Sequence, residues 1–382
     1  MNSFAFVNGT IVGLTGDPSD RPPIERVAIE QGVIVTGPAS PPDQIIDLEG
    51  GYLLPGFIDT QVNGGGGLLF NDSPTVETIR GIGTAHRQYG TTSFLPTLIS
   101  DDLDKVDMAM RAVEQAIEAG VPGVVGIHLE GPFLNSARKG THDPAKFRRM
   151  DDDAIRLLSS LQRGRTLVTL APEFCDDDQI GRLTEAGVIV AVGHSDADYA
   201  RTRSAFAAGM SGVTHMYNAM SPLNHRAAGV VGATLDNDTV YAGIIVDGQH
   251  VSPPALRIAL RARPHDRFML VTDAMPTVGN ATKSFTLQGK TIRVENGVCV
   301  EENGTLAGSD LDMATALRNA MAMMAVPIST AAVMASAAPA RFLHLADRGT
   351  FAQGQRADMV WLDADHQIRG VWQGGVRAFT AG

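Results

Sequence analysis

The sequence has only two cysteines, Cys175 and Cys299, in 382 residues. They are too few and too far apart for a disulfide framework or a thiolate metal site, so we interpret both as thiols in a reducing compartment. Basic residues are also in deficit, since 31 Lys and Arg oppose 42 Asp and Glu and leave a formal charge of −11. A nucleic-acid backbone demands a basic face, which excludes it as the main partner, whereas a small anion needs only one or two local cations.

Long apolar runs are missing as well. The first ten residues, MNSFAFVNGT, contain no basic region followed by an apolar stretch, so we expect no secretory signal. The most apolar segment, 320–340, is interrupted by Pro327 and carries Ser and Thr, which favours two buried helices over a membrane span. We therefore expect a soluble, cytoplasmic protein without a membrane partner.

Short strand-like runs separated by Gly and Pro mark both ends of the chain. They cover residues 4–7, 27–30 and 33–36 at one end and 358–362 and 371–378 at the other. This pattern predicts a discontinuous β-sandwich domain, formed by residues 1–54 and 346–382, around a central domain at 55–345. Two unrelated flaps are the alternative.

Eight apolar runs of strand length occupy the central region, and helical patterns lie between them. The runs cover residues 57–62, 93–97, 124–129, 167–171, 188–192, 212–215, 240–246 and 268–272. Such alternation predicts an α/β fold, a (β/α)8 TIM-like barrel. Strand-like alternation and Gly turns at 283–303, after the eighth run, predict a hairpin over the barrel mouth.

Polar side chains collect just after these strands, at the ends that form the active-site face of a βα barrel. His194 and His215 follow consecutive strands, and Glu130 follows the third. Two imidazoles and one carboxylate leave a position open for water, as catalytic zinc sites do. Asp273, after the eighth strand, is placed to take a proton from that water and pass it to a leaving amine. The sequence thus predicts Glu130, His194 and His215 as metal ligands and Asp273 as a catalytic residue.

Several longer motifs resemble the amidohydrolase superfamily and, within it, the N-acetylglucosamine-6-phosphate deacetylase family. They are PGFID at 55–59, HLEGPF at 128–133, GHS at 193–195, THMYNAM at 214–220, DGQH at 247–250 and TDA at 272–274. The resemblance covers essentially the whole chain. It implies metal-dependent hydrolysis of N-acetyl-D-glucosamine 6-phosphate to D-glucosamine 6-phosphate and acetate, in amino-sugar catabolism or cell-wall recycling.

The resemblance also implies roles for residues that the sequence pattern does not single out. His142 matches the residue that contacts the acetamide carbonyl, and Arg226 matches one that reaches across a homodimer into the neighbouring site. A guanidinium suits a phosphate bidentately, which agrees with that role. The substrate-binding group that the resemblance implies is Thr141, His142, Asn218, Ala219, Arg226, His250, Leu306, Ala307 and Gly308.

One departure from the superfamily concerns the first strand. Many members carry His-x-His there and bind a second metal, whereas this chain has Gln61 and Asn63, whose neutral amides are poor zinc ligands. We therefore expect one divalent metal ion per subunit, with the second-metal positions vacant. Zinc is the expected ion, and iron, manganese and cobalt also suit such a site.

Three rival functions differ in what they require. N-acetylgalactosamine 6-phosphate, or another N-acyl amino-sugar phosphate, differs from the expected substrate in details that the sequence does not resolve. A cyclic amidase such as a dihydroorotase requires the histidine pair that Gln61 and Asn63 replace. A catalytically silent scaffold predicts damage to the metal ligands or to Asp273, and none is seen.

Overall fold

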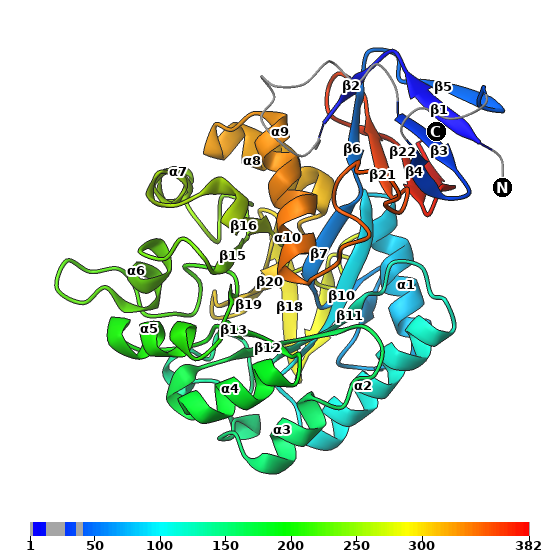
Figure 1. The fold of residues 1–382 in the computed structure, drawn as a ribbon. Helices are drawn as coiled ribbons and strands as arrows, with labels where there is room; N and C mark the ends of the chain where they lie inside the picture. The colour runs from blue at the N-terminus through cyan, green and yellow to red at the C-terminus, as the bar shows by residue number, and fades with distance from the viewer. Residues whose placement is uncertain (1–2, 13–26, 36–40, 382) are drawn as a thin grey trace.

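The computed structural model describes residues 3–12, 27–35 and 41–381. Eight parallel strands form its central sheet, in the order β16-β15-β14-β13-β12-β11-β10-β7, with helices around the outside (Figure 1). These strands are β7 (Phe57–Val62), β10 (Thr91–Ile99), β11 (Gly126–Glu130), β12 (Arg165–Leu170), β13 (Ile189–Val192), β14 (Gly212–Val213), β15 (Tyr241–Ile244) and β16 (Phe268–Leu270). Each overlaps one of the eight predicted runs, so the prediction of a (β/α)8 barrel is confirmed.

The barrel closes between its first strand and the chain that follows its last. The Asp273 N–H donates to the Gln61 carbonyl at 3.0 Å. The buried Asp59 carboxylate of β7 accepts a hydrogen bond from the Thr272 hydroxyl at 2.5 Å. Burial raises the pKa of Asp59 to about 7 although this hydrogen bond acts to lower it. The seam therefore joins the two segments that carry Gln61 and Asp273.

The helices pack buried residues on the barrel, and several begin at a polar residue whose side chain caps the helix. At the N-terminus of α4, Asp176 and Gln179 form a reciprocal capping box. Asp198 caps the N-terminus of α5. On α2, Val106 and Met110 are among the residues buried against the strands. The helices are α1 (Val76–Arg87), α2 (Leu103–Glu118), α3 (Asp152–Leu158), α4 (Asp177–Glu185), α5 (Tyr199–Ala207), α6 (Gly229–Leu235), α7 (Pro253–Ala262), α8 (Met313–Met324), α9 (Ile328–Ala332) and α10 (Ala338–Phe342). Every helix in the described ranges is too short or too polar to cross a membrane.

Both ends of the chain build a separate β-sandwich (Figure 1). Its sheets have the orders β4-β3-β1-β5 and β2-β6-β21-β22-β23. Phe6 and Trp372 lie between them, with ring centroids 4.9 Å apart. The strands are β1 (Phe4–Val7), β2 (Thr10–Ile11), β3 (Val27–Glu30), β4 (Val33–Val35), β5 (Gln44–Asp47), β6 (Tyr52–Pro55), β21 (Met359–Leu362), β22 (Ile368–Gln373) and β23 (Val376–Thr380). Because β6 pairs with β21, the two ends share one sheet, and the alternative of two unrelated flaps is wrong.

Two strand predictions at these ends need adjustment. The run at 371–378 is not one strand, because Gly374 and Gly375 adopt positive φ angles of 55° and 77° and form a turn between β22 and β23. The predicted strand at 33–36 ends at Val35 in the structure, and position 36 lies outside the described residues.

The segment after β16 forms a four-stranded antiparallel sheet, and the prediction of a single hairpin at 283–303 is wrong. The reason is that three tight turns, at Gly289, Gly297 and Gly304, divide the segment. We call this sheet the inserted sheet; its strands are β17 (Ser284–Leu287), β18 (Lys290–Glu295), β19 (Val298–Glu301) and β20 (Leu306–Ser309). A short hairpin, β8 (Gly64–Gly65) and β9 (Leu68–Leu69), follows β7.

Candidate metal centre and active site

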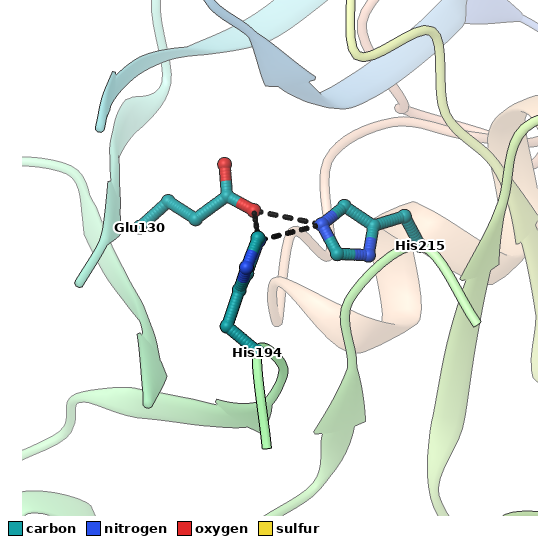
Figure 2. A group of neighbouring side chains, drawn as sticks. All are labelled: Glu130, His194 and His215. Atoms are coloured by element: carbon teal, nitrogen blue, oxygen red, sulfur yellow. Dashed lines mark hydrogen bonds and ion pairs between the residues drawn. The ribbon is translucent and has the colours of Figure 1, made fainter. Parts of the chain in front are cut away.

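Three buried side chains meet where the barrel strands end. Glu130 is the last residue of β11, His194 follows β13 and His215 follows β14. Both histidines have positive φ angles, 49° and 28°, so the chain turns sharply just past each strand. The side chains point toward one another from three different strands (Figure 2). The structure therefore brings together the three residues predicted as metal ligands.

The spacing of the ligand atoms suits a metal ion. Glu130 Oε1 lies 3.1 Å from His194 Nε2 and 2.9 Å from His215 Nε2, and the two Nε2 atoms are 3.1 Å apart (Figure 2). Two ligands of a tetrahedral zinc ion, each about 2.0–2.1 Å from it, lie roughly 3.3 Å apart. One carboxylate oxygen and two imidazole nitrogens at nearly this separation fit a small divalent cation.

Hydrogen bonds orient these ligands. His194 Nδ1 lies 2.8 Å from the Arg138 carbonyl oxygen, which leaves Nε2 toward the centre. Gln61 Nε2 donates to Glu130 Oε2 at 3.2 Å. Burial acts to raise the pKa of Glu130, but hydrogen bonds from His194 and His215 outweigh it and hold this pKa well below its usual range. The carboxylate is thus ionised and ready to bind a cation.

Asp273 lies beside this cluster, with a positive φ of 51° just after β16. Its Oδ1 accepts two hydrogen bonds, from Gln61 Nε2 at 3.0 Å and from Asn63 Nδ2 at 2.7 Å. Burial raises the pKa of Asp273 to about 6, and the negative charge of Glu130 adds to the increase. The two amides at the expected second-metal positions therefore act as hydrogen-bond donors that orient Asp273.

His142 lies beside His194, in a turn between two short 3-10 helices, Ser136–Arg138 and Pro144–Lys146. Its ring centroid is 4.4 Å from that of His194, and its Nδ1 is 2.8 Å from Ser100 Oγ. Burial and, next, the neighbouring His194 lower the pKa of His142 to about 3. The imidazole is therefore neutral at physiological pH.

A cavity of about 320 Å³ opens over the cluster and is of a size that suits a small molecule. The predicted residues that line it are Glu130, Thr141, His142, His194, His215, Asn218, Ala219, His250, Asp273, Leu306 and Gly308. Ala307 does not line it and packs instead in the apolar cluster of the inserted sheet. Arg226 does not line it either and lies in the exposed segment 222–227.

Two of the lining residues are held by neighbours. His250 Nδ1 lies 2.6 Å from Asp247 Oδ2, and Asn218 Nδ2 donates to the His215 carbonyl at 3.3 Å. Burial acts to raise the pKa of Asp247, but the hydrogen bond and charge of His250 leave it below its usual range. The acid therefore fixes the orientation of the His250 ring at the cavity wall.

The sequence analysis missed residues that support the site. Ser100 follows β10, so the rule that found the other site residues applies to it; the predicted strand stopped at 97, whereas β10 runs to Ile99. Arg138 orients His194 through its main-chain carbonyl, a role that no side-chain pattern indicates. Glu301 meets Thr141 from the inserted sheet, 160 residues away along the chain.

Comparison with known proteins agrees with this geometry. Residues 52–380 match the model of the Amidohydrolase family. The chain is 45% identical to an N-acetylgalactosamine-6-phosphate deacetylase of Shewanella sp. (strain ANA-3), over 87% of this chain and 85% of that protein. It is 36% identical to an N-acetylglucosamine-6-phosphate deacetylase of Haemophilus influenzae, over 85% of this chain and 86% of that protein. The crystal structure of N-acetylglucosamine-6-phosphate deacetylase from Pasteurella multocida superposes with a TM-score of 0.93 at 32% identity, covering 99% of this chain and 100% of that one. The chain belongs to the amidohydrolase family.

Proposed function

We propose that this protein hydrolyses N-acetyl-D-glucosamine 6-phosphate to D-glucosamine 6-phosphate and acetate with the help of one divalent metal ion. The observation that carries the proposal is the convergence of Glu130, His194 and His215 beside Asp273 at the wall of one cavity. The similar proteins are deacetylases of N-acetylated amino-sugar phosphates, which supports this substrate class for the present chain.

In this proposal, Glu130, His194 and His215 hold the metal. When bound, a divalent cation acts as a Lewis acid that lowers the pKa of a water ligand and polarises a carbonyl. Asp273 takes a proton from the water as the water oxygen bonds to the acetamide carbon. The same carboxyl group then gives that proton to the sugar nitrogen as the carbon–nitrogen bond breaks. Neutral His142 donates a hydrogen bond to the carbonyl oxygen as negative charge develops there.

Gln61 and Asn63 favour one metal ion over two in this proposal. Both amides donate to Asp273 Oδ1, so their nitrogens face the acid, and the hydrogen bonds leave Oδ2 for the reacting water. We propose zinc as the resident ion, with iron, manganese and cobalt as alternatives that suit the same donor set. Metal analysis of the purified protein distinguishes them, and about one equivalent per chain is expected.

The remaining cavity residues are proposed to hold the sugar phosphate. They are Asn218, Ala219, His250, Leu306 and Gly308. The exposed position of Arg226, away from its own cavity, supports a homodimer in which Arg226 of the partner subunit reaches the phosphate. We also propose that 55–345 is the catalytic domain and that 1–54 with 346–382 is the β-domain, because residues of the two terminal segments alone form one apolar cluster.

A second substrate, N-acetyl-D-galactosamine 6-phosphate, is favoured by the 45% identity to the Shewanella deacetylase. The two sugars differ only in the orientation of one hydroxyl. Acetate release measured on both, under identical conditions, gives a kcat/KM ratio that assigns the substrate. Absence of acetate from both sugars with metal-loaded protein would refute the proposed function.

A further inference from the structure

A buried carboxylate of the inserted sheet reaches the loop that carries His142. Glu301 ends β19, and its side chain is only 6% exposed. Its Oε1 accepts a hydrogen bond from Thr141 Oγ1 at 2.9 Å and one from Lys290 Nζ at 2.9 Å. Burial acts to raise the pKa of Glu301, but these two hydrogen bonds outweigh it and the pKa is lowered. The carboxylate is therefore ionised and bridges two parts of the fold.

The loop that Glu301 contacts lacks strand or α-helix pairing of its own. Residues 139–143 form turns between two short 3-10 helices. They also pack directly on a metal ligand, since a Cβ added to Gly140 would lie 3.3 Å from His194 Cε1. A loop without a hydrogen-bonded ladder is positioned by its side-chain contacts, and Thr141 supplies the one next to His142.

The inserted sheet touches the other support of His142 as well. Gln288, in the turn between β17 and β18, donates from Nε2 to the Ser100 carbonyl at 3.5 Å. Ser100 Oγ is the hydrogen-bond partner of His142 Nδ1. The same sheet also forms part of the cavity wall through Leu306 and Gly308.

We propose that Glu301 is a positioning residue, which fixes His142 against the acetamide carbonyl by holding Thr141. This inference rests on the proposed function, because it takes the role of His142 from it. A displaced His142 weakens stabilisation of the developing oxyanion, which affects turnover more than binding of the sugar phosphate. In this view the Thr141 hydroxyl serves the loop and not the substrate.

The test uses full-length, metal-loaded protein and measures kcat and KM for acetate release. Glu301→Ala removes the acceptor, whereas Glu301→Gln keeps an acceptor oxygen at Oε1. Thr141→Val removes the donor with little change of shape. Glu302→Ala is the matched control, because it makes the same kind of change at the adjacent, exposed position.

We expect Glu301→Ala and Thr141→Val each to lower kcat about tenfold to a hundredfold, the range that a misplaced catalytic group produces. KM and metal content should stay within threefold of wild type, and Glu301→Gln should recover most of the activity. The double variant should be no worse than either single one. Hydrogen exchange of the peptide spanning 139–147 should accelerate in Glu301→Ala and not in the control.

The inference is overturned if Glu301→Ala keeps kcat within twofold of Glu302→Ala, or if the effects of Glu301→Ala and Thr141→Val multiply. Should Glu301→Ala fail to fold, Thr141→Val with unchanged kcat overturns it alone. Wild-type protein that releases no acetate from either sugar phosphate refutes the proposed function instead, so the two failures are distinguishable.

Discussion

Replacing Asp273 by Asn should abolish most turnover while it leaves the site intact. Asp273 Oδ1 accepts hydrogen bonds from Gln61 and Asn63, and an asparagine oxygen in the same place keeps both. The amide nitrogen then takes the position of Oδ2 and cannot accept a proton. General acid–base catalysis contributes about 10²–10⁴-fold, or about 3–5 kcal/mol in the activation free energy, and we expect kcat to fall by that factor.

The same geometry predicts what should not change. The three proposed ligands keep their contacts in Asp273→Asn, so about one metal per chain should remain. Asp273→Ala provides the comparison, because it removes the hydrogen-bond acceptor of Asn63, and a buried donor left unpaired costs about 1–3 kcal/mol of stability. Acetate release, metal analysis and denaturant unfolding of both variants separate chemistry from folding. Asp273→Asn with kcat within threefold of wild type, or with its metal lost, would refute this reasoning.

The remaining predictions concern metal binding, pH and stability. His194→Ala should lose metal and acetate release together, and an active His194→Ala protein with less than a tenth of its metal would contradict the ligand assignment. The kcat/KM profile should fall on the acid side with an apparent pKa at or below about 6, because Asp273 must be ionised and a bound cation favours its charged form; full activity two pH units below that value would exclude Asp273 as the base. Asp59 has a pKa of about 7 in the fold against an ordinary 3.8, so the folded state binds more protons between these values and loses stability as pH rises through this window, by up to about 4 kcal/mol. In metal-free protein, Asp59→Asn should therefore raise the free energy of unfolding at pH 8 and not at pH 4. An equal increase at both pH values would contradict a buried charge on Asp59.

The parts of this protein that follow from one general rule were predictable from sequence. Side chains placed after successive parallel strands must meet at one face, which is why Glu130, His194 and His215 could be grouped before any coordinates. The ends of the strands were less predictable. β14 covers only Gly212–Val213, because His215 has to turn out of the strand direction to face the centre.

Contacts between distant, irregular segments were not predictable. No local pattern pairs Glu301 with Thr141, since the two residues are 160 positions apart along the chain. Gln61 and Asn63 were interpreted as vacant metal positions, and the structure adds that both bind the carboxylate of Asp273. That role depends on closure of the barrel between β7 and the end of β16, which is a property of the whole fold.

Titration of the metal-free protein with a divalent ion tests the central claim most directly. Acetate release from the two sugar phosphates is measured after complete chelation and after stepwise addition of zinc. We expect no release without metal, a linear rise up to about one equivalent per chain and no further rise beyond it. Release that survives complete metal removal, or that requires two equivalents, would contradict a single ion held by one carboxylate and two imidazoles.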